Sequence, residues 1–406
     1  MSGERHSETV IQTNYESLLK LMRENQMDYK WASMFVRKLS DDETAFTTDN
    51  ETKEWALKKG FYPGRVELYG LTEENYTDYL PDYNYFMIHP INHHFRIWIN
   101  DKLSLKYTLN SNGCADSMPE YYLYVENNGD YTYLMDAPET IKKDRDFILN
   151  LLKIKGTLAV KPNSGTSGGR GFMKLEWRDQ KIWENNKVIT LKDFEDIVAS
   201  LKNHIVTEYV YQHQELAKIW PSSECTLRII MIKNPEENTY STKTWDCIVS
   251  YARFGSSISG DASNLSSGGI GVGFDFNTGY FSDFGIRYRR FCPDGDWKCS
   301  EHPDTKVKWE YTQLPNWDFV RDKILQICNH ISSLDYLGFD VIITSSGCKL
   351  CEINTHPACD YEQVMCGPIL KKSGARKFFE KKGLFDVNPD ELHTAYCASQ
   401  RGATEK

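Results

Sequence analysis

The sequence lacks the features that would place the protein in or across a membrane. No apolar run approaches the roughly 20 residues that a membrane-spanning helix needs. Residues 1–14 are polar and lack the apolar stretch of a secretory signal peptide. An internal repeat and a low-complexity linker are also missing from the sequence. We therefore expect a folded cytoplasmic protein with no membrane span.

The chain also lacks an excess of positive charge. Its formal net charge is −9, because 57 acidic residues outnumber 48 basic ones, whereas nucleic-acid-binding domains carry a basic patch or stripe. The eleven cysteines are an odd number without regular spacing, which is typical of reduced thiols rather than of a disulfide framework. We expect no nucleic-acid partner, and the sequence does not indicate an oligomeric state.

The sequence does have enough apolar residues for a large folded core. Hydrophobic residues make up 40% of the 406 residues and aromatic residues 13%, which suits two or three lobes. Helical spacing of apolar residues marks the segments 8–39, 189–203 and 317–334. Strand-forming residues mark the segments 121–125, 157–160, 204–210, 226–233, 244–254, 268–276 and 339–354. Because many strands follow one another as hairpins, this order predicts an α+β fold with antiparallel sheets.

A glycine-rich loop follows one of the expected strands. Residues 159–171 read AVKPNSGTSGGRG, and a returning strand follows them. Glycines leave backbone N–H groups accessible to an anion, and Lys161 can supply a cation to a phosphate. The loop lacks the GK[ST] ending of a Walker A motif, and a strand follows where a dinucleotide fingerprint needs a helix. The loop alone is equally typical of a flexible hairpin tip and of an anion-binding loop.

A second hairpin carries acidic and amide side chains. Residues 339–354 read FDVIITSSGCKLCEIN, with a tight turn between two strands. Strand alternation puts Glu352 and Asn354 on one face, and the hairpin can bring Asp340 opposite them. Two carboxylates and an amide oxygen suit magnesium, which readily shares its shell with substrate phosphates. The alternative is a strand whose solvent-exposed face is simply polar.

Two further segments carry residues suited to a nucleotide. In TEYVYQHQEL, Glu208 ends a strand, and the backbone of Tyr209 and Val210 can meet the edge of a base. Glu215, further along, can accept hydrogen bonds from ribose hydroxyls. Arg228 lies within a strand that reads as buried, and a buried arginine needs an anionic partner. That partner is either one of the acidic residues or a phosphate.

Taken in order, these segments are similar to the ATP-grasp superfamily, and more closely to its sugar-transfer-associated, or TupA-like, branch. The matching stretches are INDKLSLKYTL, VKPNSGTSGGRGF, EYVYQHQELAKIWPSSECTLRIIM, SNLSSGGIGVGFD and FDVIITSSGCKLCEINTHP. The resemblance covers roughly residues 95–370. It implies two α+β lobes that close on ATP, preceded here by an N-terminal helical extension. It also implies Mg²⁺ as the metal, with Mn²⁺ as a substitute.

The resemblance implies roles for individual residues. The implied nucleotide-binding residues are Lys102 (with Lys106 as the alternative), Lys161, the lid residues Ser164, Gly165, Thr166, Ser167, Gly168 and Gly169, Glu208, Tyr209 and Val210 beside the adenine, and Glu215 at the ribose. Asp340, Glu352 and Asn354 would hold the metal. The implied catalytic residues are Lys161, which would contact the α/β-phosphates or the adenine side, and Arg228, which would stabilise the transferred phosphate or the tetrahedral intermediate. Arg253 and Asn264 are implied on the acceptor side.

The resemblance also implies a division of the chain and a reaction. The expected parts are an N-terminal extension (1–84), a first lobe (85–155), a lid subdomain (156–213), a C-terminal lobe with the metal site (214–395) and a tail (396–406). The expected reaction is ATP-dependent joining of a small-molecule carboxylate to an amine through an acylphosphate, in surface polysaccharide or other conjugate synthesis. A small-molecule kinase and a nucleotide-binding protein without catalysis stay open as alternatives.

Overall fold

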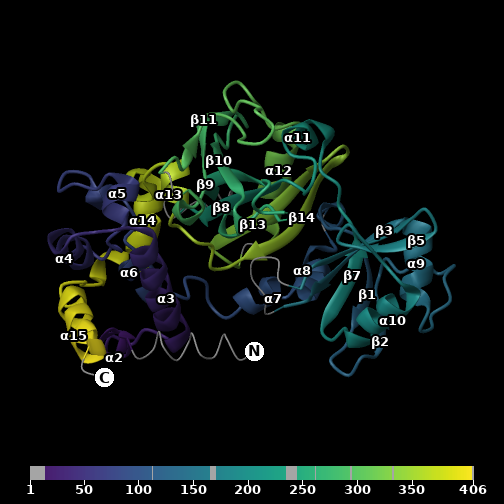
Figure 1. The fold of residues 1–406 in the computed structure, drawn as a ribbon, viewed down its shortest axis with the longest axis horizontal. Helices are drawn as coiled ribbons and strands as arrows, with labels where there is room; N and C mark the ends of the chain where they lie inside the picture. The colour runs from purple at the N-terminus through teal and green to yellow at the C-terminus, as the bar shows by residue number, and fades with distance from the viewer. Residues whose placement is uncertain are drawn as a thin grey trace.

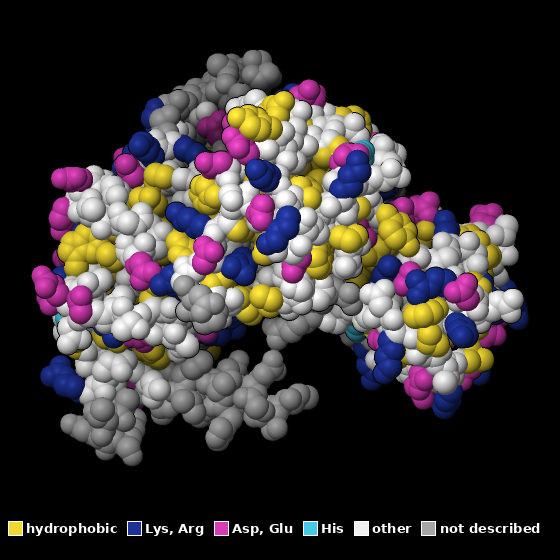
Figure 2. All heavy atoms as spheres, turned by 45° about the horizontal axis from the view of Figure 1, so that its top comes forward, with side chains coloured by type: hydrophobic (Ala, Val, Ile, Leu, Met, Phe, Trp, Pro, Cys, Tyr) yellow, Lys and Arg dark blue, Asp and Glu magenta, His cyan; other side chains and the backbone are white. Residues whose placement is uncertain are grey.

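The computed structural model describes residues 14–111, 113–164, 171–234, 245–260, 262–292, 295–331 and 333–404. Figure 1 shows a helical lobe at one end, a large sheet in the middle and a smaller lobe at the other end. Within the described ranges, no helix is long and apolar enough to cross a bilayer. On the face seen in Figure 2, acidic and basic side chains are interspersed rather than separated by sign.

Two seven-stranded sheets form the framework of the protein. The sheet of the smaller lobe has the order β2-β1-β7-β3-β4-β5-β6, and the central sheet has the order β12-β11-β10-β9-β8-β13-β14. Every pair of neighbouring strands in these two sheets is antiparallel. The prediction of an α+β fold with antiparallel sheets is therefore confirmed.

The strand bounds follow the sequence patterns closely, and β8 coincides with its predicted segment. The smaller lobe contains β1 (Tyr121–Val125), β2 (Tyr131–Tyr133), β3 (Thr157–Pro162), β4 (Met173–Arg178), β5 (Lys181–Glu184), β6 (Lys187–Ile189) and β7 (His204–Glu208). The central sheet contains β8 (Thr226–Lys233), β9 (Trp245–Phe254), β10 (Ile270–Phe274), β11 (Phe281–Ile286), β12 (Lys298–Cys299), β13 (Tyr336–Thr344) and β14 (Gly347–Asn354).

The helices cover these sheets and build the third lobe. They are α2 (Glu16–Glu24), α3 (Tyr29–Ala45), α4 (Asn50–Lys58), α5 (Arg65–Tyr69), α6 (Asp82–Met87), α7 (Arg96–Asn100), α8 (Lys102–Leu109), α9 (Phe147–Lys155), α10 (Leu191–Ser200), α11 (Gln214–Ile219), α12 (Trp317–His330), α13 (Glu362–Met365), α14 (Ser373–Lys381) and α15 (Leu392–Thr404). Short 3-10 turns lie at Tyr76–Asp78, Ala115–Ser117, Leu265–Ser267, Arg289–Phe291, Ile369–Lys371 and Leu384–Asp386.

Each of the three parts of the protein is stabilised by its own cluster of buried apolar residues. In the smaller lobe, Phe147 of α9 and Phe194 of α10 pack with buried strand residues such as Leu158. Thr190 caps α10 through a reciprocal capping box with Asp193, which satisfies N–H groups that would otherwise lack partners. In the central sheet, Ile324 of α12 belongs to the cluster that covers one face.

The first and last described helices, α2 and α15, meet in the helical lobe. Residues of α2, α3 and α15 share one buried cluster, which includes Leu18, Phe35 and Leu392. The Leu18 backbone N–H donates to the Ser399 hydroxyl over 3.2 Å. The segment expected to be a tail from residue 396 is therefore helical as far as Thr404. The remaining domain boundaries stay a prediction.

The short helices α7 and α8 connect the helical lobe to the smaller lobe (Figure 1). Asp101 caps α8 by accepting from the Ser104 N–H over 2.8 Å. Asn163, just after β3, accepts hydrogen bonds from the Lys102 and Leu103 backbone N–H groups. Its side chain also donates to the Asp101 carboxylate over 2.5 Å. The start of the glycine-rich loop is thereby attached to the first turn of α8.

Candidate functional site

The β13–β14 hairpin brings the predicted metal residues together. Asp340 lies opposite Glu352, and Gly338 lies opposite Asn354. The register shifts after this point, because Val341 pairs with Leu350. Cys351 is therefore the extra residue of a β-bulge, a feature that redirects neighbouring side chains. The Asn354 amide donates to the Glu352 carboxylate over 3.2 Å.

Two arginines neutralise Asp340. The Arg228 Nε and Nη2 atoms donate to the two carboxylate oxygens over 2.6 and 3.1 Å, and the Arg253 Nη2 atom lies 3.1 Å from Oδ2. Burial of Asp340 opposes its ionisation, but the two guanidinium groups outweigh burial and hold its pKa below the ordinary value. The anionic partner of Arg228 in the structure is thus an acidic residue.

The predicted acceptor-side residues belong to the same cluster. The Arg253 Nε atom donates to the Thr226 hydroxyl over 2.9 Å, and its Nη1 atom donates to the Asn264 side-chain oxygen over 3.3 Å. Asn264 precedes a short 3-10 turn. Sequence reasoning gave Arg253 and Asn264 one shared role, and the structure places them in direct contact with each other.

Lysines from two elements approach the same hairpin. The Lys102 Nζ atom, at the start of α8, lies 3.6 Å from Glu352 Oε2. Burial lowers the pKa of Lys161 on β3, and the charge of Lys102 lowers it further, whereas Cys351 and Glu352 raise it. No carboxylate oxygen of the described residues lies within ion-pair distance of the Lys161 Nζ atom. Lys161 is therefore a half-buried cation without a carboxylate partner among the described residues.

Lys106, the alternative to Lys102, has a different place. Its Nζ atom lies 2.9 Å from the Asp136 carboxylate and donates to the Pro119 carbonyl over 2.8 Å. These contacts tie α8 to the segments that flank β1. Lys102, rather than Lys106, is the lysine of α8 that contacts Glu352.

The residues predicted beside the adenine and ribose lie between β7 and α11. Glu208 accepts from the Glu120 N–H over 3.0 Å, the Tyr209 hydroxyl donates to Glu224 over 3.0 Å, and Val210 is buried. The Glu215 carboxylate is largely exposed and lies 2.6 Å from Lys218. The Glu215 carboxylate is therefore paired with Lys218 on the surface of α11.

The glycine-rich loop joins β3 to β4. These strands form an antiparallel hairpin in which Val160 pairs with Met173, so the predicted hairpin is confirmed. Ser164 is half-buried just after β3. The other predicted lid residues fall outside the part of the chain that the structure describes: Gly165, Thr166, Ser167, Gly168 and Gly169.

Sequence reasoning missed two neighbours of this cluster. The Tyr121 hydroxyl on β1 is buried and has no hydrogen-bond partner among the described residues. Burial raises the pKa of this hydroxyl, and the nearby Cys351, Asp101 and Glu352 raise it further. Cys351 was missed because a one-residue bulge leaves little trace in a pattern of apolar residues. No sequence signal marked Tyr121, because its position depends on how the two sheets meet.

The predicted metal residues have a suitable donor set for an oxygen-liganded cation. Within the described chain, no group of three or more His, Cys, Asp or Glu side chains could hold a metal ion. The predicted set instead combines the Asp340 and Glu352 carboxylates with an amide. The Asn354 amide nitrogen donates to Glu352, so the side-chain oxygen of Asn354 is the atom left to contribute to a cation site.

Comparison with known proteins identifies a family for the chain. The family described as sugar-transfer associated ATP-grasp matches residues 84–378, more than two thirds of the chain. No curated protein sequence matches the chain.

Similar solved structures include the ATP-grasp ligase PsnB with Mg and ADP, at 11% identity and a TM-score of 0.35, covering 72% of this chain and 61% of that one. N5-carboxyaminoimidazole ribonucleotide synthetase from Thermotoga maritima has 12% identity and a TM-score of 0.32, covering 67% and 49%. D-alanine–D-alanine ligase from Bacillus anthracis has 14% identity and a TM-score of 0.32, covering 76% and 69%. The chain spans about three fifths of the PsnB length. The family match over residues 84–378 shows that the chain belongs to the sugar-transfer-associated ATP-grasp family.

Proposed function

We propose that the protein is an ATP- and magnesium-dependent ligase that joins a small-molecule carboxylate to an amine. The observation that carries this proposal is the cluster at the β13–β14 hairpin, where four cationic side chains surround two carboxylates. The cations are Lys102, Lys161, Arg228 and Arg253, and the carboxylates belong to Asp340 and Glu352. Four positive charges minus two negative charges leave a formal surplus of two, which favours a polyanion such as ATP.

Asp340, Glu352 and Asn354 are the residues that would hold magnesium. Asp340 keeps further lone pairs on its carboxylate oxygens beside its arginine contacts. When bound, the metal would neutralise charge on the phosphates. We assign the nucleotide to the space bounded by this hairpin, by Lys102 on α8 and by Lys161 on β3.

The cationic residues would supply positioning and charge neutralisation. In the first step a carboxylate oxygen attacks the γ-phosphorus and ADP leaves. In the second step the amine nitrogen attacks the acyl carbon, phosphate leaves and the nitrogen loses a proton. Lys161 would donate to phosphate oxygens, while Arg228 and Arg253 would stabilise the transferred group through N–H donors not used on Asp340. The family description favours a setting in surface polysaccharide or conjugate synthesis.

Turnover with paired substrates tests the reaction type. The full-length protein is incubated with MgATP and panels of carboxylic acids, with and without amines, and ADP release is followed. ADP release that needs both an acid and an amine supports the ligase. A stable phosphorylated product formed without an amine would instead assign a kinase.

A charge-removing variant tests the metal residues. Glu352→Gln keeps the size of the side chain and removes its charge, and we expect turnover to fall about 100-fold or more. Glu195→Gln on the exposed surface of α10 is the matched control and should keep full turnover. Unchanged turnover and nucleotide binding in Glu352→Gln would overturn the metal assignment.

A further inference from the structure

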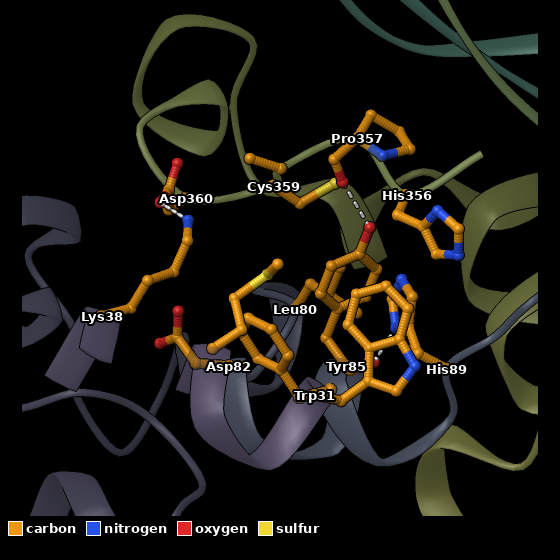
Figure 3. A pocket seen from close by; sticks show the side chains of 13 residues that line it. Trp31, Lys38, Leu80, Asp82, Tyr85, His89, His356, Pro357, Cys359 and Asp360 are labelled. Atoms are coloured by element: carbon orange, nitrogen blue, oxygen red, sulfur yellow. Dashed lines mark hydrogen bonds and ion pairs between the residues drawn. The ribbon is translucent and has the colours of Figure 1, made fainter. Parts of the chain in front are cut away.

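The helical lobe contacts the segment that directly follows the proposed metal residue Asn354 (Figure 3). Asn354 ends β14, and residues 355–363 lead from it into α13. The family match begins at residue 84, so α2, α3, α4 and α5 lie outside it. The contacts of these helices with residues 355–363 therefore lie beyond what the family match accounts for.

An ion pair links α3 to this segment. The Lys38 Nζ atom donates to Asp360 Oδ2 over 2.6 Å (Figure 3), and the Arg65 Nη2 atom of α5 lies 3.9 Å from the same oxygen. Burial opposes the ionisation of Asp360, but the two cations outweigh burial and hold its pKa well below the ordinary value. Because removing one partner of a largely buried ion pair is costly, the pair fixes Asp360 relative to α3.

Hydrogen bonds to the backbone add a second link. The Gln363 side chain donates to the Leu80 carbonyl over 3.1 Å and accepts from the Leu80 N–H over 2.9 Å. The Tyr69 hydroxyl of α5 donates to the Asp360 carbonyl over 2.9 Å. All of these residues are buried, so water does not compete for the bonds and they restrain the segment strongly.

Aromatic side chains hold the part of the segment that is nearest to Asn354. The centroid of the Trp31 ring of α3 lies 4.6 Å from that of His356. The Tyr85 hydroxyl of α6 donates to the Pro357 carbonyl over 2.6 Å. The cavity between these groups has a volume of about 60 Å³, whereas ligand pockets have about 300 Å³ or more. Residues 356–360 therefore have little room to move independently of the helical lobe.

The path from this contact region to Asn354 is short. Gly338 of β13 lies opposite Asn354, and a Cβ atom on Gly338 would lie 2.8 Å from Pro357 Cβ. Pro357 therefore packs directly on the backbone of β13. Thr355 is buried and donates to the Asn100 side-chain oxygen over 2.9 Å. A displacement of the chain at Pro357 would thus reach Asn354 within a few residues.

The segment also contacts the row of residues that carries Asp340. Arg228 pairs with Asp340 on one side and with Tyr251 on the other, and paired residues of neighbouring strands share a face of the sheet. The Tyr251 hydroxyl donates to Glu362 Oε1 over 3.0 Å. The Asp360 N–H donates to the other oxygen of Glu362 over 2.9 Å. Two hydrogen bonds therefore connect the residue that pairs with α3 to the row beside the metal residues.

We propose that α3 and α5 are a positioning unit for the metal site, and that they act through the ion pair between Lys38 and Asp360. Lys38 is a positioning residue, because it contacts residues 355–363 rather than the nucleotide site. It keeps the chain after Asn354 in the course that leaves the Asn354 oxygen beside Glu352. The effect on metal binding rests on the proposed function, whereas the mechanical coupling between α3 and residues 355–363 does not.

Calorimetry of ADP binding to the full-length protein, with and without Mg²⁺, tests the proposal. We expect Lys38→Met to weaken ADP binding about tenfold in the presence of Mg²⁺, as is typical when a residue that supports a metal ligand is removed. ADP binding without Mg²⁺ should stay as in the wild type. A general structural defect would weaken both measurements. Equal effects with and without Mg²⁺, or no effect with Mg²⁺, would overturn the proposal.

Further variants control for the loss of a lysine. Lys38→Arg keeps the cation and should bind MgADP as the wild type does, whereas Asp360→Asn removes the pair from the other side and should behave like Lys38→Met. Lys58→Met is the matched control, because the Lys58 Nζ atom lies 2.6 Å from Glu54 on the surface of α4. Weakened MgADP binding in Lys58→Met to the same extent would contradict a specific role of Lys38.

Hydrogen exchange of the ligand-free protein separates this proposal from the proposed function. In Lys38→Met, backbone amides within residues 355–363 should exchange about tenfold faster than in the wild type, while those of β8 should not change. Unchanged exchange in residues 355–363 would overturn the coupling. Faster exchange there, in a protein whose wild type binds no MgADP, would refute the proposed ligase and retain the coupling.

Discussion

Two largely buried charge clusters in this protein have formal net charges of opposite sign. The strand cluster, defined as Lys102, Lys161, Arg228, Arg253, Asp340 and Glu352, carries a formal surplus of two positive charges. The helix cluster, defined as Lys38, Arg65, Asp42, Asp82 and Asp360, carries a formal surplus of one negative charge. Both bury arginine–carboxylate pairs. The comparison teaches that similar arginine–carboxylate pairs can belong to clusters of opposite formal net charge.

The largest effect is expected from breaking the helix cluster. Arg65→Met removes the cation that contacts Asp42 and Asp82, and unpaired buried carboxylates are costly. We expect the free energy of unfolding at neutral pH to fall by about 3–5 kcal/mol. The loss should shrink as the pH falls, because protonation removes the unpaired charges. Urea unfolding measures this, and a loss below about 1 kcal/mol would mean that the cluster tolerates the missing cation.

A comparable substitution in the strand cluster should make the stability of the protein depend on added anions. Asp340→Asn leaves the Arg228 and Arg253 guanidinium groups without their carboxylate, so we expect a stability loss of about 3 kcal/mol. Pyrophosphate should recover part of this stability in Asp340→Asn, because it supplies negative charge. It should not recover stability in Arg65→Met. Equal recovery in both variants would remove the distinction between the clusters.

Lys161 allows a test through pH. A phosphate contact needs the charged amine, so binding is complete below the pKa of Lys161 and is lost as the pH rises through it. Burial lowers that pKa. The loss of MgADP affinity should therefore begin at a lower pH than it would for a lysine with the ordinary pKa. Lys161→Arg should bind with little change over this range, whereas Lys161→Ala should bind about tenfold more weakly or worse at neutral pH. Calorimetry between neutral pH and pH 10 measures both, and a flat wild-type profile would contradict the assignment.

The smallest effect concerns two buried tyrosine hydroxyls. The Tyr85 hydroxyl donates to the Pro357 carbonyl over 2.6 Å and contacts Tyr336, whereas the Tyr121 hydroxyl has no partner among the described residues. Tyr85→Phe should lower the free energy of unfolding by about 1–2 kcal/mol. Tyr121→Phe should leave stability unchanged within about 0.5 kcal/mol and weaken MgADP binding if the hydroxyl meets the nucleotide. A larger stability loss in Tyr121→Phe than in Tyr85→Phe would reverse the comparison.

Much of the strand cluster could be predicted from the sequence. Strand alternation predicted that Glu352 and Asn354 share one face, and the hairpin was expected to bring Asp340 opposite them. Asp340 does pair with Glu352 in the hairpin. The helix expected within residues 189–203 is also present, as α10 (Leu191–Ser200). The bulge at Cys351 was not predicted, because a one-residue register shift leaves little trace in a pattern of apolar residues.

The sequence by itself determined the long strands, the antiparallel hairpins and the family, since each depends on local patterns or on motifs that are contiguous in the chain. Only the tertiary structure decided which charges meet. Arg228 and Asp340 are 112 residues apart, and the Tyr85 hydroxyl meets the Pro357 carbonyl across 272 residues. The cavity between α3, α6 and residues 356–360 (Figure 3) likewise depends on how these distant segments pack. Such contacts arise from packing between distant segments, for which neither the apolar periodicity nor the residue order of one chain carries a signal.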